Sequence, residues 1–303
     1  MKLFVRSAVL GLCWLLAASV YADQGQVKLQ KKGDQVEVTI DGQPFTTYHT
    51  TAQYPKPFFH PVRSVGGTII TRELENPKDH PHHKGVWCAI DEVNGIKFWA
   101  EKGIIRNVKT EIVEAEGNPA RLLIVNHWLG EDGRPILEET EKVAIYGNRL
   151  MAFDITFKAM ADEVVFEDTK EGLFGIRVAN SMRESEGGRV FNQDGVQGTK
   201  ETWGKHHNWI DYVGEVNDQT HGVALFDHPE NPRRSRYHVR NYGLFTLSPF
   251  GENAYTNGKN EAQPLHLKKG ETFRLRYALY IHPGDTQSAK VAEVYEQWVK
   301  AAK

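Results

Sequence analysis

The 303-residue chain is poor in cysteine, which limits how its fold can be stabilised. Its two cysteines are Cys13 and Cys88, and we expect Cys13 to be removed with an amino-terminal leader. A single remaining cysteine cannot form an internal disulfide, so stability must come from an ordinary hydrophobic core. Cys88 lies in the apolar run of residues 86–90, where a buried, inert thiol is expected rather than a nucleophile.

Long apolar segments are also absent. The apolar run of residues 8–20 is shorter than the roughly 20 residues that a helix needs to cross a bilayer, and no later segment approaches that length. Because Lys2 and Arg6 precede this run and compact residues end it at Ala22, it is typical of a secretory signal peptide. We therefore predict a signal peptide over residues 1–22, a single β-sandwich domain over residues 23–303, no membrane span, and a periplasmic or secreted protein after cleavage near Ala22.

The chain lacks an excess of charge of either sign. It has 37 basic and 39 acidic residues, which gives a formal net charge of −2, and no charged run or basic stripe stands out. Nucleic acid and anionic membrane surfaces are therefore poor candidates as partners. A small-molecule or oligosaccharide ligand fits this balance better.

Helical periodicity is missing from most of the chain, whereas strand patterns recur. Residues 36–40 alternate apolar and polar side chains and run into Asp41-Gly42, a hairpin signal. Further short strands are expected at residues 122–128, 141–146, 150–157, 164–166, 173–178, 223–226, 244–247 and 273–281. Such strands without interleaved helices predict a mainly β fold, an antiparallel β-sandwich or supersandwich.

The carboxyl terminus departs from this pattern. Over residues 286–302, apolar side chains recur at three- and four-residue steps, and Asp285 is placed to cap the first turn. We expect a terminal amphipathic helix that packs on the sheet through Val291, Val294, Tyr295, Trp298 and Ala302.

Residues 79–87 form the most informative segment, because they place His80, His82 and His83 in a turn bounded by proline and glycine. Imidazole changes its charge near neutral pH and is a common metal ligand, so a cluster at a loop-to-strand junction indicates a site. The alternative is a solvated, His-rich surface turn without function.

Other polar clusters fall between the expected strands. Arg177 and Arg183 lie an even number of residues apart, so on one extended strand they share a face and offer guanidinium groups to a sugar or a carboxylate. Glu171 stands at the entry to that strand and is our candidate carboxylate for proton transfer. Surface arginines without a ligand are the alternative.

A later segment, residues 203–212, brings together aromatic and donor side chains. Trp203 and Trp209 present broad apolar faces with an N–H at the edge, which suits a pyranose ring, although core packing explains them as well. Lys205 lies between them, and His228 and His238 follow. With the His-rich turn, these imidazoles are candidates for an acid–base or metal-binding group.

These motifs carry a resemblance to a known family. The segments at residues 80–87, 172–179, 203–205, 209–212, 226–229 and 242–245 resemble those of the bacterial family labelled PmoA-like, over nearly the whole chain after residue 22. The label implies methane oxidation, but the membrane subunit behind that name is a multi-helix integral protein, and this chain has no comparable spans. The resemblance instead implies work on carbohydrate. The strand pattern also resembles, more distantly, the galactose-mutarotase type of β-supersandwich.

Three functions follow from these observations. The first is an exported carbohydrate-active enzyme, a lyase, hydrolase or epimerase, in which His83, Glu171 and His228 exchange protons. Its substrate-binding residues are His80, His82, Arg177, Arg183, Trp203, Lys205, Trp209 and His238. The second is an enzyme that binds a divalent metal through two or three of the histidines, although no spacing is a specific metal signature. The third is a non-catalytic glycan-binding module.

Overall fold

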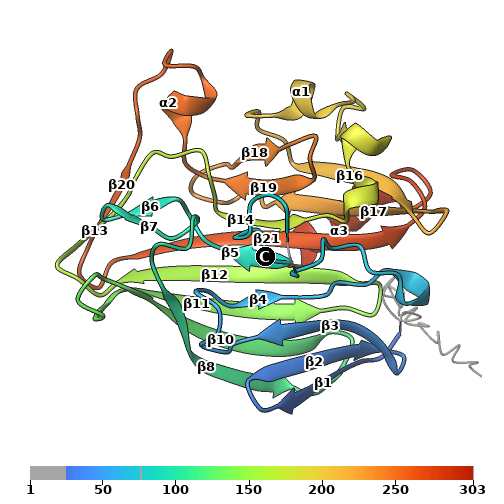
Figure 1. Cartoon of the computed structure of the whole chain (residues 1–303), viewed down its shortest axis with the longest axis horizontal. Coiled ribbons are helices and arrows are strands. Elements are labelled where there is room, and N and C mark those ends of the chain that lie inside the picture. The colour runs from blue at the N-terminus through green and yellow to red at the C-terminus, as the bar shows by residue number, and fades with distance from the viewer. Residues whose placement is uncertain (1–24, 76, 303) are drawn as a thin grey trace, which may run out of the picture.

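The structure, a computed structural model, describes residues 25–75 and 77–302, so the predicted signal peptide lies outside the described residues. The fold is mainly β, and the strand pairs among these residues are antiparallel, as in β14 (Phe174–Arg177) with β19 (Leu244–Ser248) and β12 (Leu150–Ala159) with β21 (Thr272–Pro283). Figure 1 shows the strands stacked in layers, with the carboxyl-terminal helix α3 (Val291–Ala301) behind them. The predicted fold class is therefore confirmed.

The strands form three sheets. The nine-stranded sheet has the order β18 (Arg236–Val239), β19 (Leu244–Ser248), β14 (Phe174–Arg177), β5 (Val86–Cys88), β4 (Phe58–Phe59), β3 (Gln43–His49), β2 (Gln35–Ile40), β1 (Val27–Lys32) and β9 (Glu116–Gly117). The eight-stranded sheet has the order β15 (Arg189–Asn192), β16 (Trp209–Val216), β17 (Gln219–Asp227), β21 (Thr272–Pro283), β12 (Leu150–Ala159), β11 (Pro135–Ile145), β10 (Ala120–Leu129) and β8 (Ile105–Glu114). The four-stranded sheet has the order β20 (Leu265–Lys268), β13 (Glu163–Phe166), β6 (Glu92–Val93) and β7 (Ile96–Lys97).

Helices are few and mostly short. They are α1 (Thr199–Thr202), α2 (Glu252–Tyr255), α3 (Val291–Ala301) and the 3-10 turns η1 (Val65–Gly67), η2 (Asn180–Met182) and η3 (Glu184–Glu186). Single turns such as α1 and α2 are too short to show helical periodicity, which explains why the sequence predicted no interleaved helices. Within the described part of the chain, no helix has the length and apolar character needed to cross a membrane.

The expected hairpin at Asp41-Gly42 is present. Ile40 pairs with Gln43, so Asp41 and Gly42 are the two turn residues, and both have positive φ, 50° and 75°. That conformation suits the right-handed twist of a hairpin. The apolar residues of β2 alternate into the core, as the period-two pattern requires.

The two large sheets pack face to face. Phe174 of β14 packs on Phe153 and Tyr277 of the eight-stranded sheet, with ring centroids 4.6 Å and 5.6 Å apart. Cys88 is buried beside this core, and burial raises the pKa of its thiol, which matches the expected inert role.

Helix α3 packs against the eight-stranded sheet in a second apolar cluster, through Val291, Val294, Tyr295 and Trp298. The amphipathic prediction is confirmed, but the helix begins later than expected. Asp285 accepts a hydrogen bond from the Ser288 backbone at 2.8 Å and so caps a separate turn that precedes α3.

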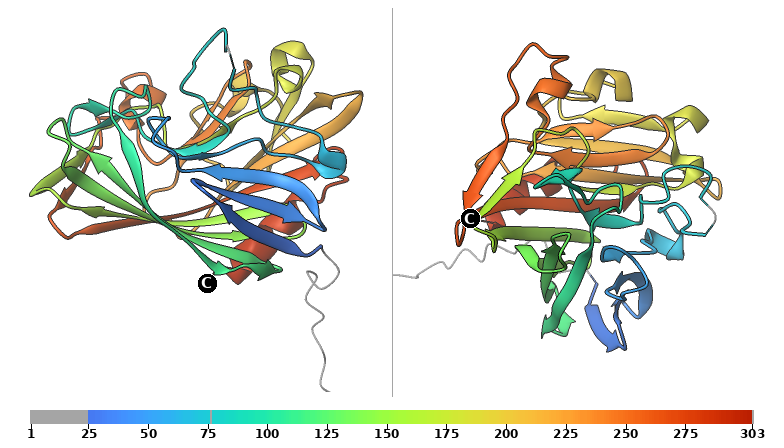
Figure 2. Two further views of the ribbon diagram at one scale, coloured as in Figure 1. Left: turned by 60° about the horizontal axis from the view of Figure 1, so that its bottom comes forward. Right: turned by 60° about the vertical axis from the view of Figure 1, so that its left-hand side comes forward.

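The opposite face of the nine-stranded sheet points away from this core. His238, Thr246, Gly175 and Trp87 are directly paired across β18, β19, β14 and β5, so their side-chain positions form one row on that outward face. Figure 2 (left) shows the cyan loop before β5, the yellow α1 and the orange α2 rising on one side of the sheets. The outward row is thereby covered by loops rather than by a second sheet.

Candidate functional site

The His-rich turn is held in place by buried cations. Arg72 donates from Nη1 to the Asp79 carbonyl at 2.9 Å, and from Nη2 to the His80 and His83 carbonyls at 2.8 Å and 3.1 Å. Its guanidinium also pairs with the Asp79 carboxylate at 2.5 Å. Because Arg72 is buried and satisfies backbone carbonyls of the turn, this segment is an anchored structure rather than a loose surface turn.

A second clamp acts on the same turn. Lys56 donates to the His82 carbonyl at 2.7 Å and to the Glu101 carboxylate at 2.6 Å. Lys84 contacts the other oxygen of Glu101 at 2.6 Å and donates to the Pro81 carbonyl at 2.9 Å. Burial lowers the pKa of Lys56 to about 8, and the Glu101 carboxylate opposes that shift.

Four rings form a continuous stack through the turn. The centroid distances from Tyr242 to His80, from His80 to His83, and from His83 to Trp87 are 4.9, 4.8 and 5.5 Å, with interplanar angles of 7°, 9° and 16°. His80 has φ of 40°, a conformation that a non-glycine residue adopts at a cost of roughly 1 kcal/mol or more. The contacts of the turn hold His80 there and place its ring between Tyr242 and His83.

Arg177 fixes the tautomer of His83. The guanidinium approaches His83 Nδ1 at 3.3 Å, and because guanidinium can only donate, Nδ1 must accept. Neutral His83 therefore carries its proton on Nε2, which is buried and has no hydrogen-bond partner among the described residues. Burial lowers the pKa of His83, with His82 and Arg177 adding to the shift. His83 is a neutral imidazole with one free N–H donor.

His238, on β18, has the opposite arrangement. Its Nδ1 lies 3.0 Å from the Lys170 carbonyl, which can only accept, so Nδ1 carries the proton and Nε2 keeps its lone pair. Tyr255 also donates to the Lys170 carbonyl, at 2.6 Å, and contacts His238 Nδ1 at 3.2 Å. Burial lowers the pKa of His238 to about 4, and the Glu171 carboxylate acts against this shift. His238 is thus a neutral imidazole with a free basic nitrogen.

Glu171 is half-buried beside this imidazole and forms an ion pair with Lys170. The Glu171 carboxylate also contributes to the raised pKa of Tyr255, after the larger effect of burial. Glu171 and His238, both predicted from sequence, therefore come together in one group. The expected shared face of Arg177 and Arg183 is wrong, because the strand ends at Arg177 and the chain turns through η2.

A hollow of about 450 Å³ is lined by Trp203, which contacts His238, and by Tyr242, which stacks on His80. Trp203 lies on one side of it and contacts His238 and Tyr255 with ring centroids 6.2 Å and 5.0 Å apart. Tyr242, the first ring of the stack, lines it as well. Its remaining lining residues are Thr199, Lys200, Val239, Arg240 and Asn241.

The other predicted residues lie elsewhere. His228 is buried against Trp298 of α3, with ring centroids 5.2 Å apart, and Trp209 belongs to the apolar cluster beneath the same helix. Lys205 is exposed and lies 3.9 Å from Glu201. The structure therefore brings His228, Trp209 and Lys205 neither to His83 and Arg177 nor to Glu171 and His238.

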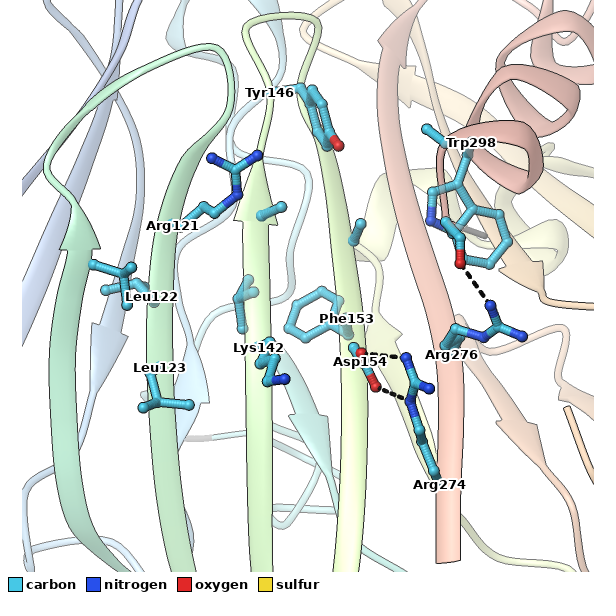
Figure 3. A pocket seen from close by; sticks show the side chains of 16 residues that line it. Arg121, Leu122, Leu123, Lys142, Tyr146, Phe153, Asp154, Arg274, Arg276 and Trp298 are labelled. Atoms are coloured by element: carbon cyan, nitrogen blue, oxygen red, sulfur yellow. Dashed lines mark hydrogen bonds and ion pairs between the residues drawn. The ribbon is translucent and has the colours of Figure 1, made fainter.

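A more apolar hollow of about 400 Å³ lies beside α3, as Figure 3 shows. Part of its polar lining is paired: Arg274 forms two hydrogen bonds of 2.7 Å with Asp154, and Arg276 donates to the Ala302 carbonyl at 2.6 Å. Its one carboxylate, Asp154, is thus held by an arginine, and no imidazole lines it, so this hollow is a poorer candidate for acid–base chemistry.

The three clustered histidines do not form a ligand set. Within residues 25–75 and 77–302, no group of three His, Cys, Asp or Glu side chains is arranged to hold a metal ion. His80 and His83 instead stack ring on ring, and His83 Nδ1 faces a guanidinium.

Sequence reasoning missed several residues of the site, namely Lys56, Arg72, Trp99, Glu101, Arg240, Tyr242 and Tyr255. Trp99 packs edge-on to His83 with ring centroids 5.2 Å apart, and it comes from a turn that carries no motif of its own. Tyr242 was part of a quoted motif, but only its stacking on His80 gives it a place in the site.

The fold and the site together define a mainly β protein with a buried, imidazole-containing site on the outward face of one sheet. Within that class, the chain belongs to the family of unknown function DUF6807, which it matches over residues 35–296. No curated protein sequence matches it. The PmoA-like resemblance is not confirmed by these comparisons.

Solved structures with a similar fold include several enzymes that are named for sugars. Galactose 1-epimerase from Lactobacillus acidophilus is 10% identical, with 86% of this chain and 99% of that chain covered and a TM-score of 0.41. A putative aldose 1-epimerase from Klebsiella pneumoniae is 11% identical, with 91% and 86% covered and a TM-score of 0.40. The heparan sulfate lyase HepC from Pedobacter heparinus is 11% identical, with 82% and 30% covered and a TM-score of 0.31. Similarity at this level does not transfer a function.

Proposed function

We propose that the chain is an exported enzyme that acts on a sugar or sugar derivative by proton transfer, with His238 as base and His83 as hydrogen-bond donor. One observation carries this proposal: two buried, neutral imidazoles on the same face of a sheet hold opposite tautomers. One offers a free lone pair and the other a free N–H. Proton abstraction with stabilisation of a developing oxyanion needs this combination.

The two imidazoles lie a few strands apart on one face of the sheet. His238 and Trp87, the ring on which His83 stacks, are separated by three strand spacings in one row of the sheet. At about 4.8 Å per spacing their Cα atoms lie about 14 Å apart. We propose that the substrate ring approaches the two imidazoles from the loop side of this face.

The surrounding groups support the two roles. As His238 Nε2 takes a proton from the substrate, the Glu171 carboxylate stabilises the imidazolium that forms. Arg177 keeps His83 neutral and leaves its Nε2–H as a hydrogen-bond donor. The Asp79 carboxylate holds Arg177 through contacts of 3.2 Å and 3.1 Å. In this proposal His238 takes the place of His228 among the three residues that the sequence analysis expected to exchange protons.

The test is turnover by protein that begins at residue 23, on a panel of aldoses, glycosides and keto-glycosides in D₂O. NMR then detects deuterium gained at carbon, elimination products and new reducing ends. We expect His238→Gln to lower turnover by about 100-fold or more, within the range usual for a lost general base. His228→Gln is the matched control, because His228 is also a buried imidazole and packs on α3.

The outcomes separate the alternatives, provided circular dichroism shows each variant folded. Full activity in His238→Gln with loss in His228→Gln would overturn the assignment of the base. Binding without turnover by the wild-type protein would favour a glycan-binding module. Activity that a chelator abolishes and one metal ion restores would favour the metal-dependent alternative.

Export is part of the same proposal and rests on the sequence of residues 1–22. Expression of the full chain in a bacterial host, followed by cell fractionation and amino-terminal sequencing, is the test. A mature protein that begins near Asp23 outside the cytoplasm is expected. An uncleaved cytoplasmic chain would contradict it.

A further inference from the structure

The covered face of the nine-stranded sheet is rich in unpaired hydrogen-bond donors. Buried side-chain nitrogens there have no partner among the described residues, and each of them is an N–H: Arg72 Nε, Arg177 Nε, Arg183 Nε, Arg240 Nε, Trp87 Nε1, Trp203 Nε1 and His83 Nε2. The Thr169 hydroxyl, which can donate or accept, is also unpaired nearby in the chain segment of Lys170. Unpaired buried donors cost free energy unless an acceptor reaches them.

The same face carries more positive than negative charge. Burial lowers the pKa of Arg72 and of Arg177, and the charge of Arg183 adds to both shifts. The Asp79 carboxylate pairs with Arg72 and Arg177. Lys56 and Lys84 likewise share one carboxylate, that of Glu101. Since the whole chain has a net charge of −2, this local excess of cations is not a general property of its surface.

The hollow between Trp203 and Tyr242 shares this character. Of the described residues that line it, Lys200 and Arg240 are cations and none is an acid. Arg240 lies over the Trp203 ring, 5.8 Å from its centroid, and lowers the pKa of His238 through its charge. Within the described residues, the Lys200 side chain forms no ion pair and no hydrogen bond. Both cations are therefore available to a ligand that also approaches His238.

We propose that the substrate is a sugar acid, whose carboxylate binds in this hollow to Arg240 and Lys200 while its ring lies toward His238. A guanidinium matches a planar carboxylate with two parallel hydrogen bonds, a geometry that it also offers to phosphate, so phosphate and sulfate are tested beside the carboxylate. The inference rests on the proposed function for the placement of the ring, but the anion site stands on the lining residues alone.

Sodium glucuronate and glucose form the matched pair of probes, because they differ only in a carboxylate at one ring substituent. Titration of the protein from residue 23 on, followed by ligand-observed NMR, should give glucuronate at least about tenfold higher affinity than glucose in 50 mM salt. That advantage should shrink in 500 mM salt, because added ions screen the partly exposed Lys200. Glucose 6-phosphate and sulfate are titrated in the same way to test whether the site prefers another oxyanion.

Lys200→Gln and Lys205→Gln are matched variants, since both remove one exposed lysine from neighbouring positions and only Lys200 lines the hollow. We expect Lys200→Gln to weaken glucuronate binding about 3- to 10-fold without changing glucose binding, and Lys205→Gln to change neither. Arg240→Gln should weaken glucuronate binding further.

Each result decides between the two proposals. Equal affinity for glucose and glucuronate, or equal effects of the two lysine variants, would overturn the sugar-acid inference and leave the acid–base proposal intact. Tighter binding of phosphate or sulfate than of glucuronate would overturn the choice of carboxylate. Selective glucuronate binding without turnover would uphold the anion site while the proposed enzyme function fails.

Discussion

Arg177 and His83 are 94 residues apart in the chain, yet a guanidinium nitrogen lies 3.3 Å from the imidazole Nδ1 in the buried part of the site. This contact converts an otherwise ambiguous histidine into a defined donor, because a guanidinium cannot accept a hydrogen bond. It also links the end of β14 to the turn that precedes β5, so the site depends on how two strands are joined in one sheet.

The first prediction concerns the protonation of His83. We expect His83 to stay neutral from pH 8 to pH 5 with its proton on Nε2, because burial and neighbouring cations lower its pKa. Long-range ¹H–¹⁵N NMR of the imidazoles measures both properties, with His83→Gln used to assign the signal. A pyridine-type Nε2, or protonation between pH 7 and 6, would contradict the geometry.

Local patterns in the sequence predicted the local structure well. The alternation in residues 36–40 and the Asp41-Gly42 turn reappear as β2, β3 and their hairpin, and the spacing of Val291, Val294 and Trp298 reappears as the buried side of α3. Both signals depend only on neighbours in the chain, which is why they can be read without a structure.

The site could be predicted only in part, because its contacts are long-range. The His-rich turn, Glu171, Arg177 and His238 were identified by residue type, but the exchange of His228 for His238 required the sheet order. Arg72 gives no sequence signal, and the motif that contains Tyr242 does not reveal its role, since a lone arginine or tyrosine is unremarkable until its partner is known. Which of several similar histidines lies in the site depends on how the strands pair, and sequence spacing does not reveal that pairing.

The second prediction is a loss of stability in acid. Burial lowers the pKa of His228 and of His238 to about 4, against 6.5 when the chain is unfolded. The unfolded state therefore binds protons first, and stability falls as pH drops from about 6.5 toward 4, by roughly 2 kcal/mol per group between pH 7 and pH 5. Urea denaturation at these two pH values should show a smaller loss for His228→Gln than for the wild type.

Exposed His266 on β20 provides the control for this experiment. His266→Gln should leave the difference between pH 7 and pH 5 as in the wild type. An unchanged difference in His228→Gln would show that this imidazole is not held neutral by burial.

The third prediction tests the clamp on the His-rich turn. Glu101→Gln leaves Lys56, whose side chain is only 1% exposed, without its carboxylate, and an unpaired buried charge costs about 3–5 kcal/mol. The free energy of unfolding should fall by this order, and the amide of His83, which donates to the His80 carbonyl at 3.0 Å, should exchange faster with solvent.

Lys97→Gln is the control for the clamp, because Lys97 lies 3.7 Å from Glu92 at an exposed position. We expect it to change stability by less than about 0.5 kcal/mol. Equal losses in Glu101→Gln and Lys97→Gln would mean that Glu101 does not neutralise a buried lysine.

The last prediction concerns a buried ion pair far from the proposed site. Asp211 lies 3.1 Å from His282 Nε2, both side chains are 0% exposed, and the Thr286 hydroxyl donates to the same carboxylate at 2.7 Å. Asp211 raises the pKa of His282 against the effect of burial, so the stabilisation by this pair is present below pH 6.5 and is lost as pH rises through the raised value. Asp211→Asn should therefore cost about 3–5 kcal/mol at pH 6 and less at pH 8.

Asp154→Asn is the control, because it removes a solvent-accessible pair with Arg274 from the same sheet; it should cost about 1 kcal/mol or less at both pH values. Urea denaturation of the two variants decides the point: a loss in Asp211→Asn that is no larger at pH 6 than at pH 8 would show that His282 is not protonated in the fold.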